Sequence, residues 1–235
     1  MLKDSVVLTG KLLIQKYNEN KELIYSEEFN NLIVTLGKNF IASRLASNTL
    51  DVMNYMAIGS SSTTADSTQI QLFNELARVS LSTATVSGTS AVFTATFGNG
   101  VGTGSITEAG IFNESSSTLL TFNAATAVGG SNNEITISSH GLNTGDQIAY
   151  SAGGGTAIGG LSEGGIYYVI KVDGDNIKLA DTYAHAGSNT ALTITPGSGI
   201  NHTIRHGYML ARTTFPVISK SSSETIAIQW VVSVG

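Results

Sequence analysis

The sequence predicts a mainly β protein, in which an antiparallel β-sandwich with one α-helix carries a small inserted β-barrel or β-sandwich domain. Three observations predict this fold class. Short runs of β-branched and aromatic residues, separated by turn residues, recur along most of the chain. Helical periodicity is confined to one segment near the N-terminus. Between Asn113 and Tyr208 the chain becomes glycine-rich, and this stretch contains all four of its histidines.

The first elements are a pair of strands followed by the helix. Strands are expected at 6–17 and 22–29, joined by a short polar turn. In the segment 30–48, apolar residues recur three and four positions apart, which predicts a helix. Asn30 or Asn31 is expected to cap its N-terminus.

Further strands of the sandwich follow the helix. Ser87-Gly88-Thr89-Ser90 is a hairpin turn between two of them. In the last strand large apolar residues recur at every second position from 226 to 234, and Trp230 is one of them, so we expect it in the core. The strands are expected at 54–58, 78–86, 91–97, 106–112, 209–215 and 226–234.

The glycine-rich stretch has the pattern of a separate small β domain. Because 106–112 and 209–215 are expected to be adjacent antiparallel strands, this domain would replace the hairpin tip between them, a position that tolerates insertion. The predicted domains are therefore 1–116 with 208–235, and 117–207. Strands of the insert are expected at 133–138, 147–150, 166–172 and 177–179, with weaker candidates at 190–195 and 202–205.

Composition limits the partners of this protein. Only 12% of its 235 residues are charged, about half the usual share. We therefore expect part of the surface to be neutral and part to be buried in contacts between subunits. The net charge is −5 and no basic run is present, which argues against nucleic acid as a partner. Cysteine is absent, which excludes disulfides and thiolate metal sites. No apolar run approaches the roughly 20 residues that span a bilayer, so no membrane insertion is expected.

The stretch SAGGGTAIGGLSEGG, residues 151–165, raises the question of a phosphate-binding loop. Such a loop needs a lysine and a hydroxyl after its last glycine, and no lysine is present here. We therefore interpret the glycines as turn residues, which allow positive φ angles between two strands.

The sequence predicts no catalytic, cofactor-binding or metal-binding residues. His202 and His206 stand four apart on an extended segment, which would separate them by roughly 13 Å, too far for one ion. A metal site shared between copies of the chain on an oligomer axis remains an alternative. The turn 173–176 resembles the start of a calcium loop but has Ala184 where the EF-hand needs glutamate, so a hairpin turn is favoured over weak calcium binding. Without a cysteine or a G-x-S-x-G turn, we expect no enzyme.

Charged residues are scarce, so the few in apolar surroundings stand out. Glu108 is expected to form a structural salt bridge with Arg78 or Arg212 that fixes strand register or a subunit contact. The sequence places no second acid beside it for a glycan-cleaving pair. Adjacent side chains on a strand face opposite ways, so one of Tyr167 and Tyr168 is expected in the core. The other would be exposed, where a glycan could stack on it.

Four stretches of the chain, taken in order, resemble a family of small structural proteins of tailed bacteriophages. The motifs AIG and NELAR are followed by TEAGIF and then by LARTTF. This order of motifs is also similar to the amino-terminal domains of phage collar-fibre proteins. In that family a short turn joins the last two motifs, whereas here roughly ninety residues intervene, enough for one small domain. Within them, residues 138–182 are similar to a β module of bacterial surface proteins and phage structural proteins. The four stretches are 31–45, 55–81, 106–113 and 209–234.

The resemblance implies a non-enzymatic structural protein of a tailed-phage virion, assembled in the cytoplasm of the bacterial host. It implies a tail or neck fibre, or a fibre-attachment protein, anchored by the host domain and with the insert projecting outward. A head (capsid) decoration protein is the close alternative, favoured slightly by the chain's end at Gly235. Expected partners are other virion proteins and further copies of the chain, as a dimer or trimer. The alternative of another class is an adhesin whose insert binds host surface glycans.

Overall fold

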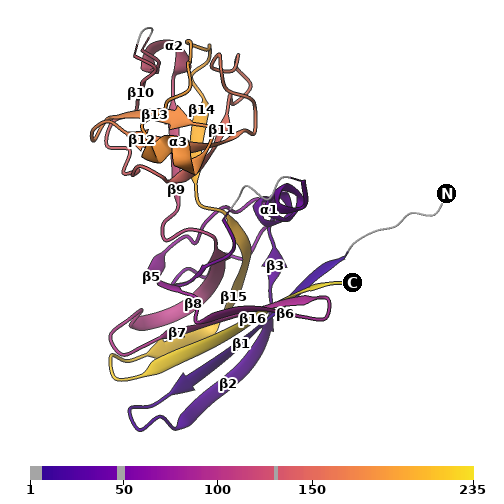
Figure 1. Ribbon diagram of the computed structural model, residues 1–235. Helices are drawn as coiled ribbons and strands as arrows, with labels where there is room; N and C mark the ends of the chain where they lie inside the picture. Colours follow the sequence, from indigo (N-terminus) through magenta and orange to yellow (C-terminus); the bar gives the residue numbers. More distant parts are fainter. Residues whose placement is uncertain (1–6, 47–50, 130–131) are drawn as a thin grey trace, which may run out of the picture. The chain divides into compact units, whose positions relative to one another are not determined.

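The computed structural model describes residues 7–46, 51–129 and 132–235 (Figure 1). Over these residues the protein is mainly β, and its sheets are antiparallel. The chain divides into two compact units, which we call the host unit (Met1–Ser115 with Tyr208–Gly235) and the insert unit (Ser116–Gly207).

The first sheet of the host unit has a strand from the C-terminal end of the chain at its centre. This strand, β16, pairs with β1 on one side and with β7 on the other. The strand order is β2-β1-β16-β7-β6, with β1 at Leu8–Tyr17, β2 at Leu23–Asn30, β6 at Thr83–Ser87, β7 at Ser90–Phe97 and β16 at Thr225–Val234.

Alternation along β16 decides which face of this sheet is buried. Every second residue from Ile226 to Val232 is buried, and the residues between them are more exposed. Trp230 is fully buried, opposite Leu12 of β1 and Phe93 of β7. The predicted core position of this tryptophan is therefore confirmed.

The second sheet of the host unit has β8 near its centre, buried continuously from Ile106 to Phe112. β8 pairs with β15, so the predicted adjacency of these two strands is confirmed. With the buried face of the first sheet, this arrangement is consistent with the predicted β-sandwich. The order is β3-β15-β8-β4-β5, with β3 at Leu32–Ile33, β4 at Tyr55–Gly59, β5 at Glu75–Ser80, β8 at Gly104–Phe112 and β15 at Met209–Lys220.

The helix of the host unit begins later than its apolar spacing indicated. Leu32–Ile33 forms β3, paired with β15, and α1 runs over Thr35–Ala46. The prediction that Asn30 or Asn31 caps the helix is therefore wrong. Pairing with β15 gives the backbone of β3 its hydrogen bonds, and this long-range partner overrides the local helical pattern.

The single strand predicted at 78–86 is two strands in different sheets. β5 pairs with β4, and β6 pairs with β7. Between them the Leu81 N–H donates to the Asn54 carbonyl at 2.7 Å, and the Ser82 N–H donates to the Thr94 carbonyl at 2.7 Å. The chain thus passes from one sheet to the other with both of these backbone N–H groups hydrogen-bonded. The hairpin between β6 and β7 forms as predicted.

The insert unit is built around one antiparallel sheet of order β10-β13-β12-β11-β14-β9. Among the residues described, this order ends at β10 and β9, so closure into a barrel stays a prediction. Its core is a cluster that includes Ile148, Val169 and Ile204. The strands are β9 (Thr118–Phe122), β10 (Ile135–Thr136), β11 (Gln147–Ser151), β12 (Ile166–Lys171), β13 (Asn176–Ala180) and β14 (His202–His206).

The insert unit departs from the sequence pattern at several positions, among them β9, a strand that the pattern did not predict. Two short helices that the pattern did not predict occur, α2 (Ala124–Ala127) and α3 (Tyr183–Gly187), each capped by the residue before it. The strand expected at 133–138 shortens to β10. Residues 190–195 form only an isolated bridge, between Thr195 and Gly159.

Candidate functional site

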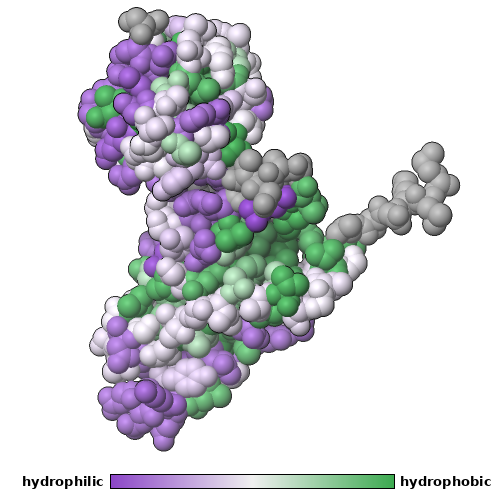
Figure 2. Space-filling model, in the orientation of Figure 1, coloured by the Kyte–Doolittle hydropathy of each residue, from purple (hydrophilic) through white to green (hydrophobic). Residues whose placement is uncertain are grey.

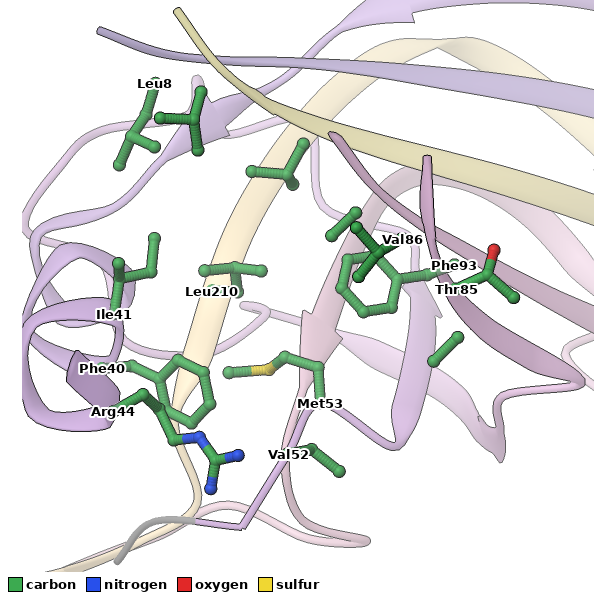
Figure 3. Close-up of a pocket in the computed structure, with 14 residues that line it drawn as sticks. Leu8, Phe40, Ile41, Arg44, Val52, Met53, Thr85, Val86, Phe93 and Leu210 are labelled. Atoms are coloured by element: carbon green, nitrogen blue, oxygen red, sulfur yellow. The ribbon is translucent and has the colours of Figure 1, made fainter. Parts of the chain in front are cut away.

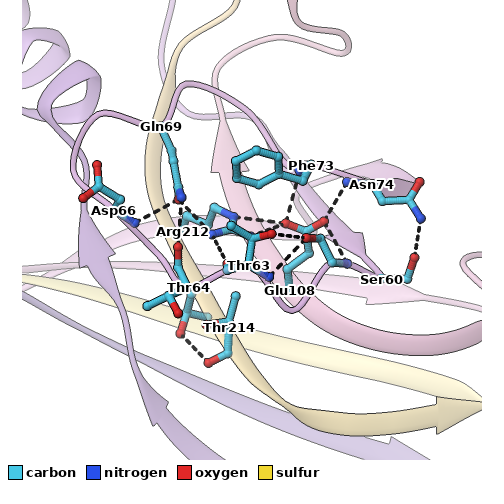
Figure 4. Close-up of polar contacts among 12 residues, drawn as sticks. Ser60, Thr63, Thr64, Asp66, Gln69, Phe73, Asn74, Glu108, Arg212 and Thr214 are labelled. Atoms are coloured by element: carbon cyan, nitrogen blue, oxygen red, sulfur yellow. Dashed lines mark hydrogen bonds and ion pairs between the residues drawn. The ribbon is translucent and has the colours of Figure 1, made fainter.

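The host unit contains a buried ion pair between Glu108 on β8 and Arg212 on β15 (Figure 4). Both side chains are fully buried, and the Arg212 Nε and Nη2 atoms donate to the same carboxylate oxygen, Oε2, at 3.0 and 2.7 Å. In the sheet, Arg212 lies opposite Gly110, two residues from Glu108 and on the same face. The pair is shielded from water, so removal of either partner would leave an uncompensated buried charge.

The carboxylate of Glu108 also holds the loop 60–74, which connects β4 to β5 and which we call the clamped loop. The Asn74 and Ser61 N–H groups donate to Oε1 at 2.9 and 3.3 Å. The Phe73 N–H donates to Oε2 at 3.3 Å. Because these donors come from the beginning and the end of the loop, one carboxylate ties both of its ends to β8.

The guanidinium of Arg212 holds the middle of the same loop. Its Nη1 donates to the Thr63 carbonyl at 2.9 Å and to Gln69 Oε1 at 2.8 Å. The centre of the Phe73 ring lies 5.2 Å from the guanidinium carbon, within the range of a cation–π contact. The ion pair and the clamped loop therefore form one polar network, which we call the clamp (Figure 4).

Gly59, the last residue of β4, makes room for the clamp. A Cβ atom at this position would lie 2.5 Å from Glu108 Oε1 and 2.5 Å from the Asn74 carbonyl oxygen. Both separations are far below van der Waals contact, so a larger residue would push the carboxylate or the loop away. This close approach explains the glycine of the AIG motif.

Arg78, the other expected partner of Glu108, lies elsewhere. Its guanidinium pairs with Glu75 at 2.7 Å, donates to the Glu114 carbonyl at 2.8 Å and lies 3.7 Å from the centre of the Phe112 ring. The pair Glu108–Arg78 is not formed because Arg78 is on β5, and β4 lies between β5 and β8. The structure thus brings Glu108 together with Arg212 alone.

A second feature of the host unit is an apolar groove of about 430 Å³. Side chains from α1 line one side of it and side chains from β6 and β7 line the other (Figure 3). Figure 2 shows apolar side chains gathered on the host unit beside α1. The sequence pattern did not predict this groove because its walls come from distant segments of the chain. Its lining includes Phe40, Ile41, Ala84, Val86, Phe93 and Leu210.

The tyrosines of the insert unit take three different positions. Tyr167 is buried, and its hydroxyl accepts a hydrogen bond from the Ser162 N–H at 2.8 Å. Tyr168 is half-buried, and its ring meets that of Tyr183 edge-on, with centroids 6.0 Å apart. Tyr183 is 68% exposed. The outward aromatic of this region is therefore Tyr183 rather than Tyr167 or Tyr168.

The two histidines of β14 are engaged in hydrogen bonds within the insert unit. His202 Nδ1 bonds to the Tyr150 hydroxyl at 2.8 Å, and its Nε2 bonds to the Ser198 carbonyl at 3.0 Å. His206 Nδ1 bonds to the Gln147 carbonyl at 3.0 Å. In the described part of the chain, no group of three or more histidine, aspartate or glutamate side chains is arranged to hold a metal ion.

The turn 173–176 uses its carboxylate to close a hairpin. Asp173 Oδ1 accepts the N–H groups of Asp175 and Asn176, each at 2.8 Å. Hydrogen bonds from the Asn176 side chain, followed by the Asp175 N–H, lower the pKa of Asp173. This is the hairpin turn that the sequence favoured over a calcium loop.

The glycine-rich loop 151–165 is closed by a carboxylate. Glu163 Oε2 accepts the Ala152 N–H at 2.6 Å. Hydrogen bonds from the Ser151 side chain, then from the Ala152 N–H, lower the pKa of Glu163. The positive-φ residues of this loop are Gly153, Gly154, Gly160 and Gly164, which fits the turn role expected for the glycines.

No protein-family model, curated protein or solved structure matches this chain. Among the residues described, no helix has both the length and the apolar character needed to cross a membrane.

Proposed function

We propose that this chain is a non-enzymatic structural protein of a tailed-phage virion, assembled in the cytoplasm of the bacterial host. In this proposal the host unit attaches the chain to other virion proteins, and the insert unit adds a second surface to the particle. The partners are virion proteins and further copies of the chain.

The clamp is the observation that carries this proposal. Residues from three of the four stretches that resemble the phage family meet there, namely Gly59, Glu108 and Arg212. Glu108 and Arg212 hydrogen-bond the clamped loop, and these bonds offset the conformational entropy that is lost when the loop is held in one shape. A loop fixed in this way suits a protein that presents a constant surface for assembly.

Within this class we favour a tail or neck location, as a fibre or a fibre-attachment protein, because the motifs are similar to those of collar-fibre proteins. A head decoration protein is the close alternative. Both roles require a surface that binds other virion proteins, and the apolar groove supplies an exposed apolar region of the kind found at protein interfaces.

The location is tested by immunogold labelling of virions made from a genome that encodes this chain, with antibody against residues 116–207. Gold on the tail or neck supports the fibre or fibre-attachment role. Gold over the head supports decoration. If mass spectrometry of purified virions finds no peptide of this chain, the virion proposal is wrong.

Glycan binding by the insert unit is the second candidate function, and it is favoured by the exposed Tyr183 beside Tyr168. An exposed aromatic face can stack on a sugar ring. The full-length chain is applied to an array of host-surface glycans, with Tyr183→Ala as the test variant and Tyr25→Ala in the host unit as the control. Loss of binding in Tyr183→Ala alone supports the adhesin role, and binding no stronger than background contradicts it.

A further inference from the structure

We propose that the host unit binds a second copy of this chain by antiparallel pairing of β6 with β6, which joins two five-stranded sheets into one continuous sheet. This interface does not depend on the virion proposal, because it rests only on the edge strand and the apolar groove.

β6 differs from the other edge strands of the host unit. Edge strands expose unpaired N–H and C=O groups, and proteins protect them with charges, proline or a very short strand. β2 has Glu27 and Glu28, β5 has Glu75 and Arg78, and β3 is only 2 residues long. By contrast, all of Thr83–Ser87 is exposed, with neither a charge nor a proline. Of these four edges, only β6 lacks any such protection against strand addition.

The sequence of β6 is complementary to itself. With Thr85 on a two-fold axis, antiparallel pairing places Ala84 opposite Val86 of the second copy, and Thr85 opposite Thr85 of the second copy. Small neutral side chains then face one another along the whole strand. The chain has a net charge of −5, which would oppose most contacts between copies. Pairing at β6 brings no like charges together, so this edge accepts an identical partner.

The apolar groove continues this interface on one face of the sheet. Ala84 lies opposite Phe93 and Val86 lies opposite Ala91 within the hairpin, and all four residues line the groove. Val86 is 82% exposed, which is high for a valine next to a groove wall. The two-fold axis places the groove-lining faces of both copies on the same side of the joined sheet. Ala84 of each copy therefore covers Val86 of the other. Removal of this apolar surface from water favours the dimer.

Single introduced cysteines test the register, because the chain has no cysteine of its own. In the proposed pairing, residues at position 85 face each other with Cβ atoms about 4.5–5.5 Å apart, close to the range of a disulfide. Position 87 points to the same side of the strand, but its counterpart in the second copy lies about 14 Å away. Ser87→Cys is therefore the matched control.

We expect full-length Thr85→Cys to form a disulfide-linked dimer under mild oxidation at least about tenfold faster than Ser87→Cys. Both variants change exposed residues, and fluorescence of the buried Trp230 verifies that each one is folded. Equal rates for the two variants, or no cross-linking of Thr85→Cys, overturn the proposed register.

Sedimentation of the full-length chain tests the association itself. We expect a dimer at micromolar concentration, and Val86→Lys to raise its dissociation constant at least about tenfold, because each copy must then cover a lysine beside the two-fold axis. Val217→Lys is the control, since Val217 is 60% exposed on β15. A monomer or trimer for the unaltered chain, or an equal effect of the two lysines, overturns the proposal. If Val86→Lys does not fold, the cysteine pair decides.

Discussion

Removal of Arg212 should destabilise the host unit more than the loss of any surface ion pair. In Arg212→Met the Glu108 carboxylate keeps its N–H donors from the clamped loop but loses the guanidinium that bonds Oε2 at 2.7 and 3.0 Å. Both partners are fully buried, and breaking such a pair costs about 3–5 kcal/mol. Domains of this kind have unfolding free energies of about 5–15 kcal/mol, so much of the stability of the host unit would be lost.

The single tryptophan of the chain makes this loss measurable in one unit. Trp230 is fully buried on β16, so its fluorescence in a urea titration reports unfolding of the host unit. With an m-value of about 2 kcal/mol per molar urea, the expected loss lowers the midpoint by roughly 1.5–2.5 M.

An exposed ion pair in the same unit supplies the control. Lys11 and Glu28 form a pair whose side chains are 62% and 53% exposed, and such pairs contribute about 0–1 kcal/mol. A midpoint shift in Arg212→Met no larger than that in Lys11→Met would refute the reasoning. Glu108→Leu combined with Arg212→Met should cost less than the sum of the two single changes, because no unpaired buried charge remains.

Three further predictions follow from the structure. Gly59→Ala should destabilise the host unit by about 1–3 kcal/mol in the same titration, because its Cβ would crowd Glu108; an unchanged midpoint contradicts this. Replacement of residues 116–207 by a short turn should leave Trp230 buried, because β8 and β15 already pair beside the junction; red-shifted tryptophan emission contradicts this. Hydrogen bonds lower the pKa of Glu163 in the folded chain, so they stabilise the closed glycine-rich loop at pH values above the unfolded pKa of about 4.3. This stabilisation is lost as the pH falls through the lower pKa of the folded state. The Ala152 amide resonance should therefore titrate with a midpoint below about 4.3 and should not titrate there in Glu163→Gln; a midpoint at or above that value in the unaltered chain contradicts it.

Local patterns predicted the parts of the fold that depend on near neighbours. Alternation along 226–234 identified the last strand and placed Trp230 in the core, because period two follows from strand geometry itself. The hairpin between β6 and β7 was predicted from its turn residues. The start of α1 was not predicted correctly, because the residues before it form β3, which pairs with β15 more than a hundred and fifty positions away.

In the candidate site too, local patterns predicted some features and distant strand pairing decided the others. Scarcity of charge in the sequence drew attention to Glu108 and offered Arg78 or Arg212 as its partner. The order of the strands decided between them, because β15 lies next to β8 whereas β4 separates β8 from β5. The clamped loop was not predicted, since its backbone N–H groups carry no sequence signal that distinguishes them from those of any other loop.

By itself, the sequence determined the β class, most of the strands, the glycine-rich turns and the short list of charges able to form a buried pair. These features follow from residue type and spacing, which act over a few positions of the chain. Only the tertiary structure decided which charges meet, what they hold and where the apolar groove opens. Those outcomes depend on strand order, which brings residues such as Ser61, Glu108 and Arg212 together from distant positions, and no local pattern encodes that order.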